Sequence, residues 1–358
     1  MSLDSIVGQD RAVAALRRAL RADRVAHAYI FAGHPGVGKM TAALEFARAL
    51  VCQDSSDDAC GKCGPCGKVA RGTHPDVHWI EPKGPGRQIK IGAFRDRETG
   101  EGLLRDLSLK PYEADRKIAL IDDAHAMNLV AANCLLKTLE EPPPRSVLIL
   151  VTPRPDALPE TVLSRCHIIR FALLRPEVIQ GQLEERGVDT AAAQFLARSS
   201  GGSLGRALEM AEEGHLPELR QKVLRILTGL AESNVIEQCS QFTAMVRELS
   251  ESRAESRSIA EWLLDLAALF YRDVAVRQLG VDQTRLSNAD VIELIDAESA
   301  ISRLGIRAIL DTIEETKGLL RSNVNIDAAA LDAFSKIAAR RSQRVARQRT
   351  PTKPGSGT

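Results

Sequence analysis

The chain has 358 residues, of which 44% are hydrophobic, 27% charged and only 4% aromatic. This length suffices for about two or three domains, and the composition is that of a globular protein whose cores are built from aliphatic side chains. The formal net charge of +1 argues against a protein that grips nucleic acid alone through a large excess of positive charge.

The first residues lack the basic start and the apolar run of a signal peptide, and no apolar run is long enough to cross a bilayer. We therefore expect a cytoplasmic protein with no membrane partner. In that setting, the seven cysteines favour a metal site or free thiols over a disulfide framework.

Helix and strand patterns alternate in the N-terminal half of the chain. Residues 9–22 have an amphipathic helical pattern, and the apolar run 27–32 predicts a buried strand that leads into a glycine-rich loop. A long helix follows through Leu50. Buried strands are predicted at 117–121 and 147–151, with a helix between them that ends at three consecutive prolines. This order predicts an α/β domain, in which helices cover both faces of a parallel sheet.

Helical patterns dominate the remainder of the chain, first as short helices and then as a bundle. The tail is basic and then rich in Pro, Gly, Ser and Thr, a composition typical of disorder. The expected parts are an α/β domain at 1–172 with a cysteine module at 52–66, a small helical domain at 173–217, a helical bundle at 218–339 and a disordered basic tail at 340–358.

Residues 33–39, GHPGVGK, match the phosphate-binding loop and lie between a predicted strand and a predicted helix, as that loop must. Gly33, Gly36 and Gly38 would let successive backbone N–H groups turn toward phosphates. Lys39 would reach the outer phosphates. A glycine-rich turn without a ligand is the weaker interpretation in this context.

Two positions weaken the case for hydrolysis of a bound ATP with Mg²⁺. Met40 stands where the motif has a Ser or Thr that ligates magnesium, and Thr41 comes one place later. A thioether is a poor ligand for this hard cation. At the end of the second strand, Asp122 would hold the magnesium shell. Asp123 stands where ATP-hydrolysing proteins with this loop usually carry a Glu that orients the attacking water. Asp is one methylene shorter, and misplacing a catalytic group by about 1 Å can cost about a hundredfold in rate.

Four cysteines follow the loop and its helix in the pattern C-x7-C-x2-C-x2-C; they are Cys52, Cys60, Cys63 and Cys66. Four thiolates at these spacings can close on one tetrahedral Zn²⁺ and leave no open position for catalysis. We interpret them as a structural zinc site. The alternatives are four unliganded thiols, or a redox pair formed by Cys63 and Cys66.

Taken together, these segments resemble the clamp-loader family of AAA+ proteins. The resemblance is carried by residues 7–9 (VGQ), the phosphate loop, the cysteine module, 72–76 (GTHPD), 133–143 (NCLLKTLEEPP) and 164–166 (SRC), and more loosely by 201–206. Met40, Asp123 and Pro153 depart from the motor pattern, so the chain is more similar to a non-motor subunit of this family than to the motor subunits gamma and tau.

The resemblance implies an AAA+-type α/β parallel-sheet domain with a zinc module, a small helical lid and a C-terminal helical collar, in a clamp-loader subunit of DNA polymerase III. The partners would be gamma or tau and delta subunits, the sliding clamp and primer-template DNA. Arg165 would act as an arginine finger in the ATP site of a neighbouring subunit, where such a guanidinium can be worth about 10³–10⁵ in rate. Arg206 would be a second phosphate-sensing arginine, with a plain surface arginine as the alternative.

Three functions compete at this point. The first is a non-motor loader subunit that supplies Arg165, and the second is a true ATPase motor, because Lys39 and Asp122 are intact. The third is a zinc protein that reads base sequence, which would need a basic helix beside the cysteines, where the chain instead has several aspartates. The basic tail is interpreted as a solvated segment rather than a DNA contact.

Overall fold

The computed structural model describes residues 2–55, 57–82, 88–94, 102–212, 216–230, 234–250, 253–322 and 324–348. The chain divides into two compact units, Met1–Gln182 with Ser200–Leu208, and Leu183–Ser199 with Glu209–Thr358. The boundaries expected at 172 and 217 stay predictions, since the segment between them contributes to both units. Among the described residues, no helix is both long and apolar enough to span a membrane.

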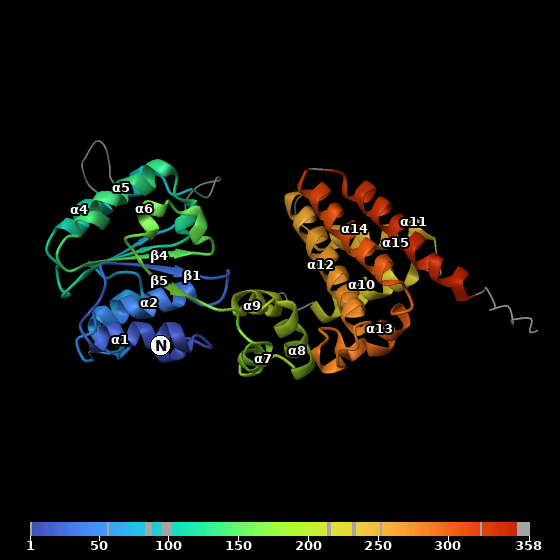
Figure 1. The fold of residues 1–358 in the computed structure, drawn as a ribbon, viewed down its shortest axis with the longest axis horizontal. Helices are drawn as coiled ribbons and strands as arrows, with labels where there is room; N and C mark the ends of the chain where they lie inside the picture. Colours follow the sequence, from blue (N-terminus) through green and yellow to red (C-terminus); the bar gives the residue numbers. More distant parts are fainter. Residues whose placement is uncertain are drawn as a thin grey trace, which may run out of the picture. The chain divides into compact units, whose positions relative to one another are not determined.

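A five-stranded parallel sheet forms the centre of the first unit (Figure 1). Its strand order is β2-β3-β4-β1-β5. The strands are β1 (Ala28–Ala32), β2 (Val77–Ile80), β3 (Lys117–Ile121), β4 (Ser146–Thr152) and β5 (His167–Arg170). The sequence pattern predicted the three central strands, which are buried throughout. It missed β2 and β5, because these edge strands are short and partly exposed and therefore lack a continuous apolar run.

Helices cover both faces of this sheet, as the alternation of patterns predicted (Figure 1). Tyr29 and Phe31 of β1 pack toward one face, and Ile30 between them packs toward the other. The first face is covered by α1 (Asp10–Arg21), α2 (Lys39–Leu50) and α3 (Gly64–Ala70), the second by α4 (Leu103–Ser108), α5 (Leu129–Glu140) and α6 (Glu160–Leu163). The predicted α/β fold class, a parallel sheet covered by helices on both faces, is confirmed.

Local sequence explains where two of these helices begin and end. The side chain of Asn128 caps α5 by accepting a hydrogen bond of 2.8 Å from the N–H of Ala131. The helix ends at Glu140, shortly before Pro142, which cannot continue it. Gly38 precedes α2 with a left-handed backbone, φ +92°, which favours glycine.

The second unit is helical. Its helices are α8 (Thr190–Ser199), α10 (Leu216–Gly229), α11 (Val235–Glu248), α12 (Arg253–Arg277), α13 (Ile292–Glu298), α14 (Arg303–Arg321) and α15 (Ile326–Gln348), while α7 (Pro176–Glu184) and α9 (Leu204–Glu212) contribute residues to both units. An edge-to-face pair, Phe242 and Phe334, joins α11 to α15 with ring centroids 5.3 Å apart. The predicted mostly helical C-terminal half is confirmed.

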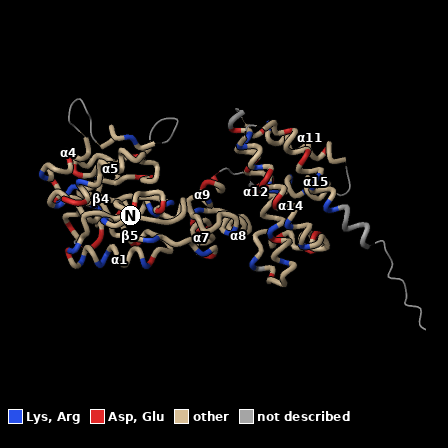
Figure 2. Tube along the Cα trace, turned by 45° about the horizontal axis from the view of Figure 1, so that its top comes forward, with Lys and Arg blue, Asp and Glu red and all other residues tan. Residues whose placement is uncertain are grey.

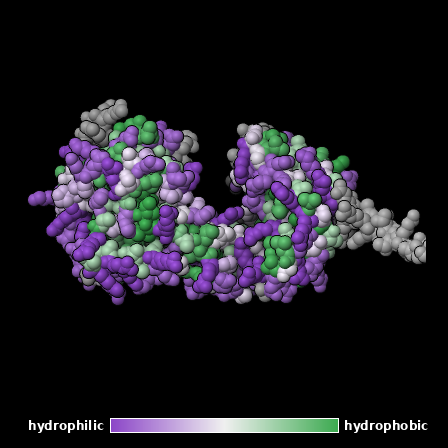
Figure 3. Space-filling model, viewed as in Figure 1, coloured by the Kyte–Doolittle hydropathy of each residue, from purple (hydrophilic) through white to green (hydrophobic). Residues whose placement is uncertain are grey.

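Lys and Arg are interspersed with Asp and Glu along the described part of each unit (Figure 2). The visible face of each unit is mostly hydrophilic, with separate hydrophobic patches between charged side chains (Figure 3). This distribution agrees with the near-neutral net charge of the whole sequence.

The last helix contradicts part of the predicted tail. α15 continues through residues 340–348, where the composition predicted disorder, so that prediction is wrong for this segment. The reason is Arg341, which is only 4% exposed. Its guanidinium pairs with the carboxylate of Glu298 and donates to the carbonyl of Leu227, near the end of α10. Composition cannot distinguish such a buried arginine from a solvated one. Residues 349–358 lie outside the described residues.

We predict that Arg341→Ala destabilises the helical unit by about 3–5 kcal/mol, because it leaves the buried carboxylate of Glu298 without its cation. Urea unfolding of the full chain, followed by far-UV circular dichroism, measures this loss. Arg340→Ala removes the exposed neighbouring charge and should leave the free energy of unfolding nearly unchanged. Equal stability of the two variants would contradict a structural role for the buried pair.

Candidate nucleotide and metal sites

The carboxyl ends of the parallel strands bring the predicted nucleotide residues to one edge of the sheet. The phosphate loop follows β1, and Asp122 and Asp123 follow β3. Lys39, in the first turn of α2, is only 7% exposed, and its Nζ donates to the carbonyl oxygen of His34 at 2.6 Å. Burial lowers the pKa of Lys39, while the negative charges of Asp122 and Asp123 oppose that shift. The structure therefore places the lysine and both acids in one site.

The phosphate loop touches the first turn of α9. The N–H of Gly205 donates to the carbonyl oxygen of Gly36 at 2.8 Å. A Cβ atom on Gly36 would lie 2.2 Å from Oγ of Ser203, and the backbone there is left-handed, with φ +70°. Glycine is thus required by both space and conformation. Arg206 follows in the same turn with an exposed side chain, so it lies on the helix that contacts the loop.

Gln9 holds the phosphate loop from another side. Its Nε2 donates to the carbonyl oxygens of Val37 at 3.2 Å and Ala172 at 2.8 Å. Its Oε1 accepts from the N–H of Ala172 at 3.0 Å. The side chain thus ties the loop to the segment that leaves β5. The sequence offered Gln9 only as part of a resemblance, and its position before a predicted helix gave no signal for this role.

Met40 and Thr41 differ in their surroundings. Met40 packs against the hydrophobic cluster of the α1–α2 face, whereas Thr41 is exposed in the first turn of α2. No hydroxyl therefore stands at the motif position that ligates magnesium in hydrolysing enzymes.

The two acids after β3 are held differently. Burial raises the pKa of Asp122, although the N–H of Asp123 and the charge of Lys39 favour its ionised form. Asp123 has a left-handed backbone with φ +45°, a conformation that aspartate tolerates better than most residues. Backbone conformations of this kind cost about 1–3 kcal/mol and cluster at functional sites. This local strain fits a site held by the surrounding sheet.

Arg165 lies in the turn between α6 and β5, with contacts of its own. Its Nη2 is 2.9 Å from Oε1 of Glu140, the last residue of α5. Its Nη1 donates to the carbonyl oxygen of Thr161 at 3.1 Å and to Oγ of Ser164 at 3.2 Å. The side chain is 35% exposed, so the guanidinium is both held and accessible.

The four predicted zinc ligands converge. The Sγ atoms of Cys52, Cys60, Cys63 and Cys66 all lie within 4.8 Å of one another. Tetrahedral Zn²⁺ with bonds of ~2.3 Å places its sulfur ligands ~3.8 Å apart, so a small inward movement would complete the site. Backbone N–H groups support the sulfur atoms: Cys60 donates to Sγ of Cys52 at 3.4 Å, and Cys63 to Sγ of Cys60 at 3.3 Å. The donor set fits a structural zinc ion.

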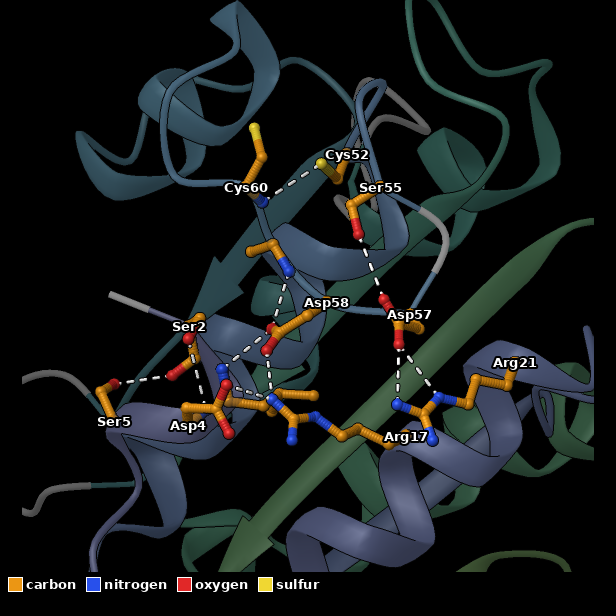
Figure 4. A network of polar contacts seen from close by, with 12 residues as sticks. Ser2, Asp4, Ser5, Arg17, Arg21, Cys52, Ser55, Asp57, Asp58 and Cys60 are labelled. Carbon is orange, nitrogen blue, oxygen red and sulfur yellow. Dashed lines mark hydrogen bonds and ion pairs between the residues drawn. The ribbon is translucent and has the colours of Figure 1, made fainter.

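An acidic network fixes the cysteine loop to the N-terminal segment and α1 (Figure 4). Asp58 accepts a hydrogen bond from the N–H of Leu3 at 2.9 Å and pairs with Nη2 of Arg17 at 2.6 Å. Asp57 pairs with Arg21 one turn further along the helix, at 2.9 Å. Asp57 and Asp58 therefore neutralise two arginines of α1. This pairing of charges beside the cysteines disfavours the base-reading interpretation, which needs basic side chains free to meet DNA.

Comparison with known proteins agrees with this geometry. A family model described as DNA polymerase III, delta subunit, matches residues 8–175. DNA polymerase III subunit delta' of Bacillus subtilis is 29% identical over 320 residues, which cover 89% of this chain and 92% of that protein. The delta' subunit of Pseudomonas aeruginosa is 33% identical over 239 residues, covering 66% of this chain and 65% of its own. This chain belongs to the clamp-loader family.

Subunits named tau or gamma/tau match over a smaller share of their own length: the gamma/tau subunit of Mycobacterium bovis is 28% identical over 351 residues, which cover 94% of this chain but 56% of that protein. Subunit tau of Escherichia coli is 35% identical over 215 residues, which cover 58% of this chain but only 32% of tau. A solved gamma-subunit-related protein of DNA polymerase III from Thermotoga maritima aligns with 92% of this chain and 99% of its own, at 17% identity and a TM-score of 0.43. Among these sequence relatives, the Bacillus subtilis delta' subunit matches over nearly the whole length of both proteins.

We predict that the purified chain carries about one zinc ion, and that replacing Cys63 and Cys66 by serine removes it, since two of four ligands are lost. Elemental analysis measures the metal content. Cys134→Ser, a change outside the cluster, is the matched control and should keep the zinc. A wild-type protein purified without chelators and free of zinc would overturn the assignment.

Proposed function

We propose that this chain is the delta-prime-type subunit of the DNA polymerase III clamp loader and helps to load the sliding clamp onto primed DNA. The observation that carries the proposal is a similarity to a delta' subunit that spans 89% of this chain and 92% of that protein, combined with an intact phosphate loop whose magnesium position is Met40. Its partners are gamma or tau and delta subunits, the clamp, and primer-template DNA within the assembled complex. Its location is cytoplasmic.

In this proposal the phosphate loop holds ATP chiefly as a structural ligand. Lys39 and the loop N–H groups would bind the phosphates, and Arg206 would approach them from α9. Asp122 would hold any Mg²⁺ through its shell, but the hydroxyl that normally completes that shell is missing at Met40. Turnover by the chain itself is then weak at most.

The catalytic contribution of the chain goes to its neighbour. Arg165 is accessible and fixed by its contacts with Glu140, Thr161 and Ser164, which suits a guanidinium that must meet a phosphate in trans. Such a group stabilises charge that develops in the transition state. The chain thereby links hydrolysis in the adjacent motor to the geometry of the ring.

A second candidate is an ATP-hydrolysing motor of the gamma/tau type. The charges of Asp122 and Asp123 act on Lys39 at the sheet edge, so the chain retains the lysine and the acids that this function requires. Hydrolysis by the isolated chain separates the two candidates directly.

We predict that the isolated chain binds ATP with Mg²⁺ but releases phosphate slowly, because Met40 supplies no hydroxyl to the metal. Equilibrium binding of a fluorescent ATP analogue, run in parallel with a phosphate-release assay, measures both properties. Lys39→Ala should abolish binding, since it removes the buried ammonium group. Rapid release that Lys39→Ala abolishes would move the chain into the motor class.

We predict that Arg165→Ala lowers hydrolysis at the neighbouring motor site by about 10³–10⁵, so that the loader keeps only the turnover of its other sites. The measurement is the steady-state ATPase of the reconstituted loader, with assembly checked by gel filtration. Arg170→Ala, a change at an exposed arginine of β5, is the control and should leave turnover unchanged. Full turnover by an assembled Arg165→Ala loader would refute the finger.

A further inference from the structure

The ion pair between Arg165 and Glu140 joins two separate elements of the first unit. Glu140 ends α5, whose residues Leu135 and Leu139 are buried against the sheet. On the other side, Leu163 and Cys166 flank the Ser164–Arg165 turn, and both pack against the same hydrophobic cluster. One core thus fixes the backbone on both sides of the pair, so the relative position of carboxylate and guanidinium is set by packing rather than by chance contact.

Glu140 stands at a position where helix electrostatics disfavours an acid. The C-terminal end of a helix carries partial negative charge, so a glutamate there is locally unfavourable. Glu140 is the last residue of α5, and Glu141 caps it. The guanidinium of Arg165, 2.9 Å from Oε1 of Glu140, offsets that repulsion. The nearby arginine therefore accounts for the acid better than the helix does.

The bonding pattern leaves the arginine able to act on a second anion. A guanidinium has five N–H groups in a planar fork. Among the described residues, Nη1 is engaged by Thr161 and Ser164 and Nη2 by Glu140, which leaves further N–H groups on Nη2 and Nε. The side chain is 35% exposed. The guanidinium is thus restrained in position and still has N–H groups that can donate to a second anion.

We propose that Glu140 is a positioning residue for Arg165: its carboxylate holds the guanidinium in the orientation that meets a phosphate of the neighbouring subunit's nucleotide. The inference rests on the proposed finger role of Arg165 and adds a second residue to it. A flexible arginine would lose rotamer freedom when it met the phosphate, and prior restraint by Glu140 removes part of that entropic cost.

The test uses the reconstituted loader with Glu140→Ala and Glu140→Gln. The quantity measured is the finger-dependent turnover, defined for each loader as its ATPase rate minus that of the Arg165→Ala loader. Because the pair is partly exposed, Glu140→Ala should lower this quantity by about two- to fivefold through kcat, with KM for ATP unchanged. Glu140→Gln should lose less, since its amide oxygen still accepts a hydrogen bond.

Two comparisons separate positioning from a general structural effect. Glu141→Ala removes the adjacent exposed acid and should leave finger-dependent turnover unchanged. In an Arg165→Ala background, Glu140→Ala should have no further effect, because a positioning residue has nothing left to position.

The outcomes are distinct. Loss of turnover with Arg165→Ala but not with Glu140→Ala would overturn this inference and leave the finger intact. An equal loss with Glu140→Ala in both backgrounds would show that Glu140 acts by another route. A faster Glu140→Ala loader would make the carboxylate a restraint on catalysis, which also overturns positioning. No effect of Arg165→Ala would remove the proposed finger and this inference with it.

Discussion

The phosphate loop depends on hydrogen bonds from outside itself. A loop that turns its N–H groups toward an anion cannot also use them to hold its own shape. Here the amide of Gln9 and the N–H of Gly205 hold the carbonyl groups of Val37 and Gly36 instead. Close approach is possible because the loop residues are glycines: a Cβ on Gly33 would lie 2.5 Å from the carbonyl oxygen of Phe171. Segments far apart in the chain are therefore fixed around one loop.

This dependence also explains the limits of prediction from sequence. The central strands and the four-cysteine cluster could be predicted, because apolar runs and short spacings are local signals. The contacts of Gln9 with Ala172 span 163 positions, and no local pattern encodes them. The short edge strands β2 and β5 were not predicted, because neither has a continuous apolar run. Arg341 was assigned to a solvated tail because of its basic surroundings in the sequence. Its partner Glu298 is distant in the chain, so no local pattern indicated the ion pair.

One helix connects the two predicted ligand sites of the first unit. α2 begins at Lys39 and ends at Leu50, and Cys52 follows two residues later. Its 12 residues span about 18 Å, so the phosphate loop and the sulfur cluster lie at opposite ends of a short rigid element. Asp58 adds a tie from the cysteine loop to α1. A zinc ion at the far end of α2 would thus fix the helix whose first turn carries the loop lysine.

Lys39 and Arg165 are held by separate sets of contacts. Lys39 contacts His34 and interacts with the acids after β3, whereas Arg165 contacts Glu140, Thr161 and Ser164. The two sets share no residue. A change such as Met40 would therefore affect the chain's own loop without altering these contacts of Arg165. If the two proposed functions depend on these separate sets of contacts, one can be lost while the other is kept, on the same sheet.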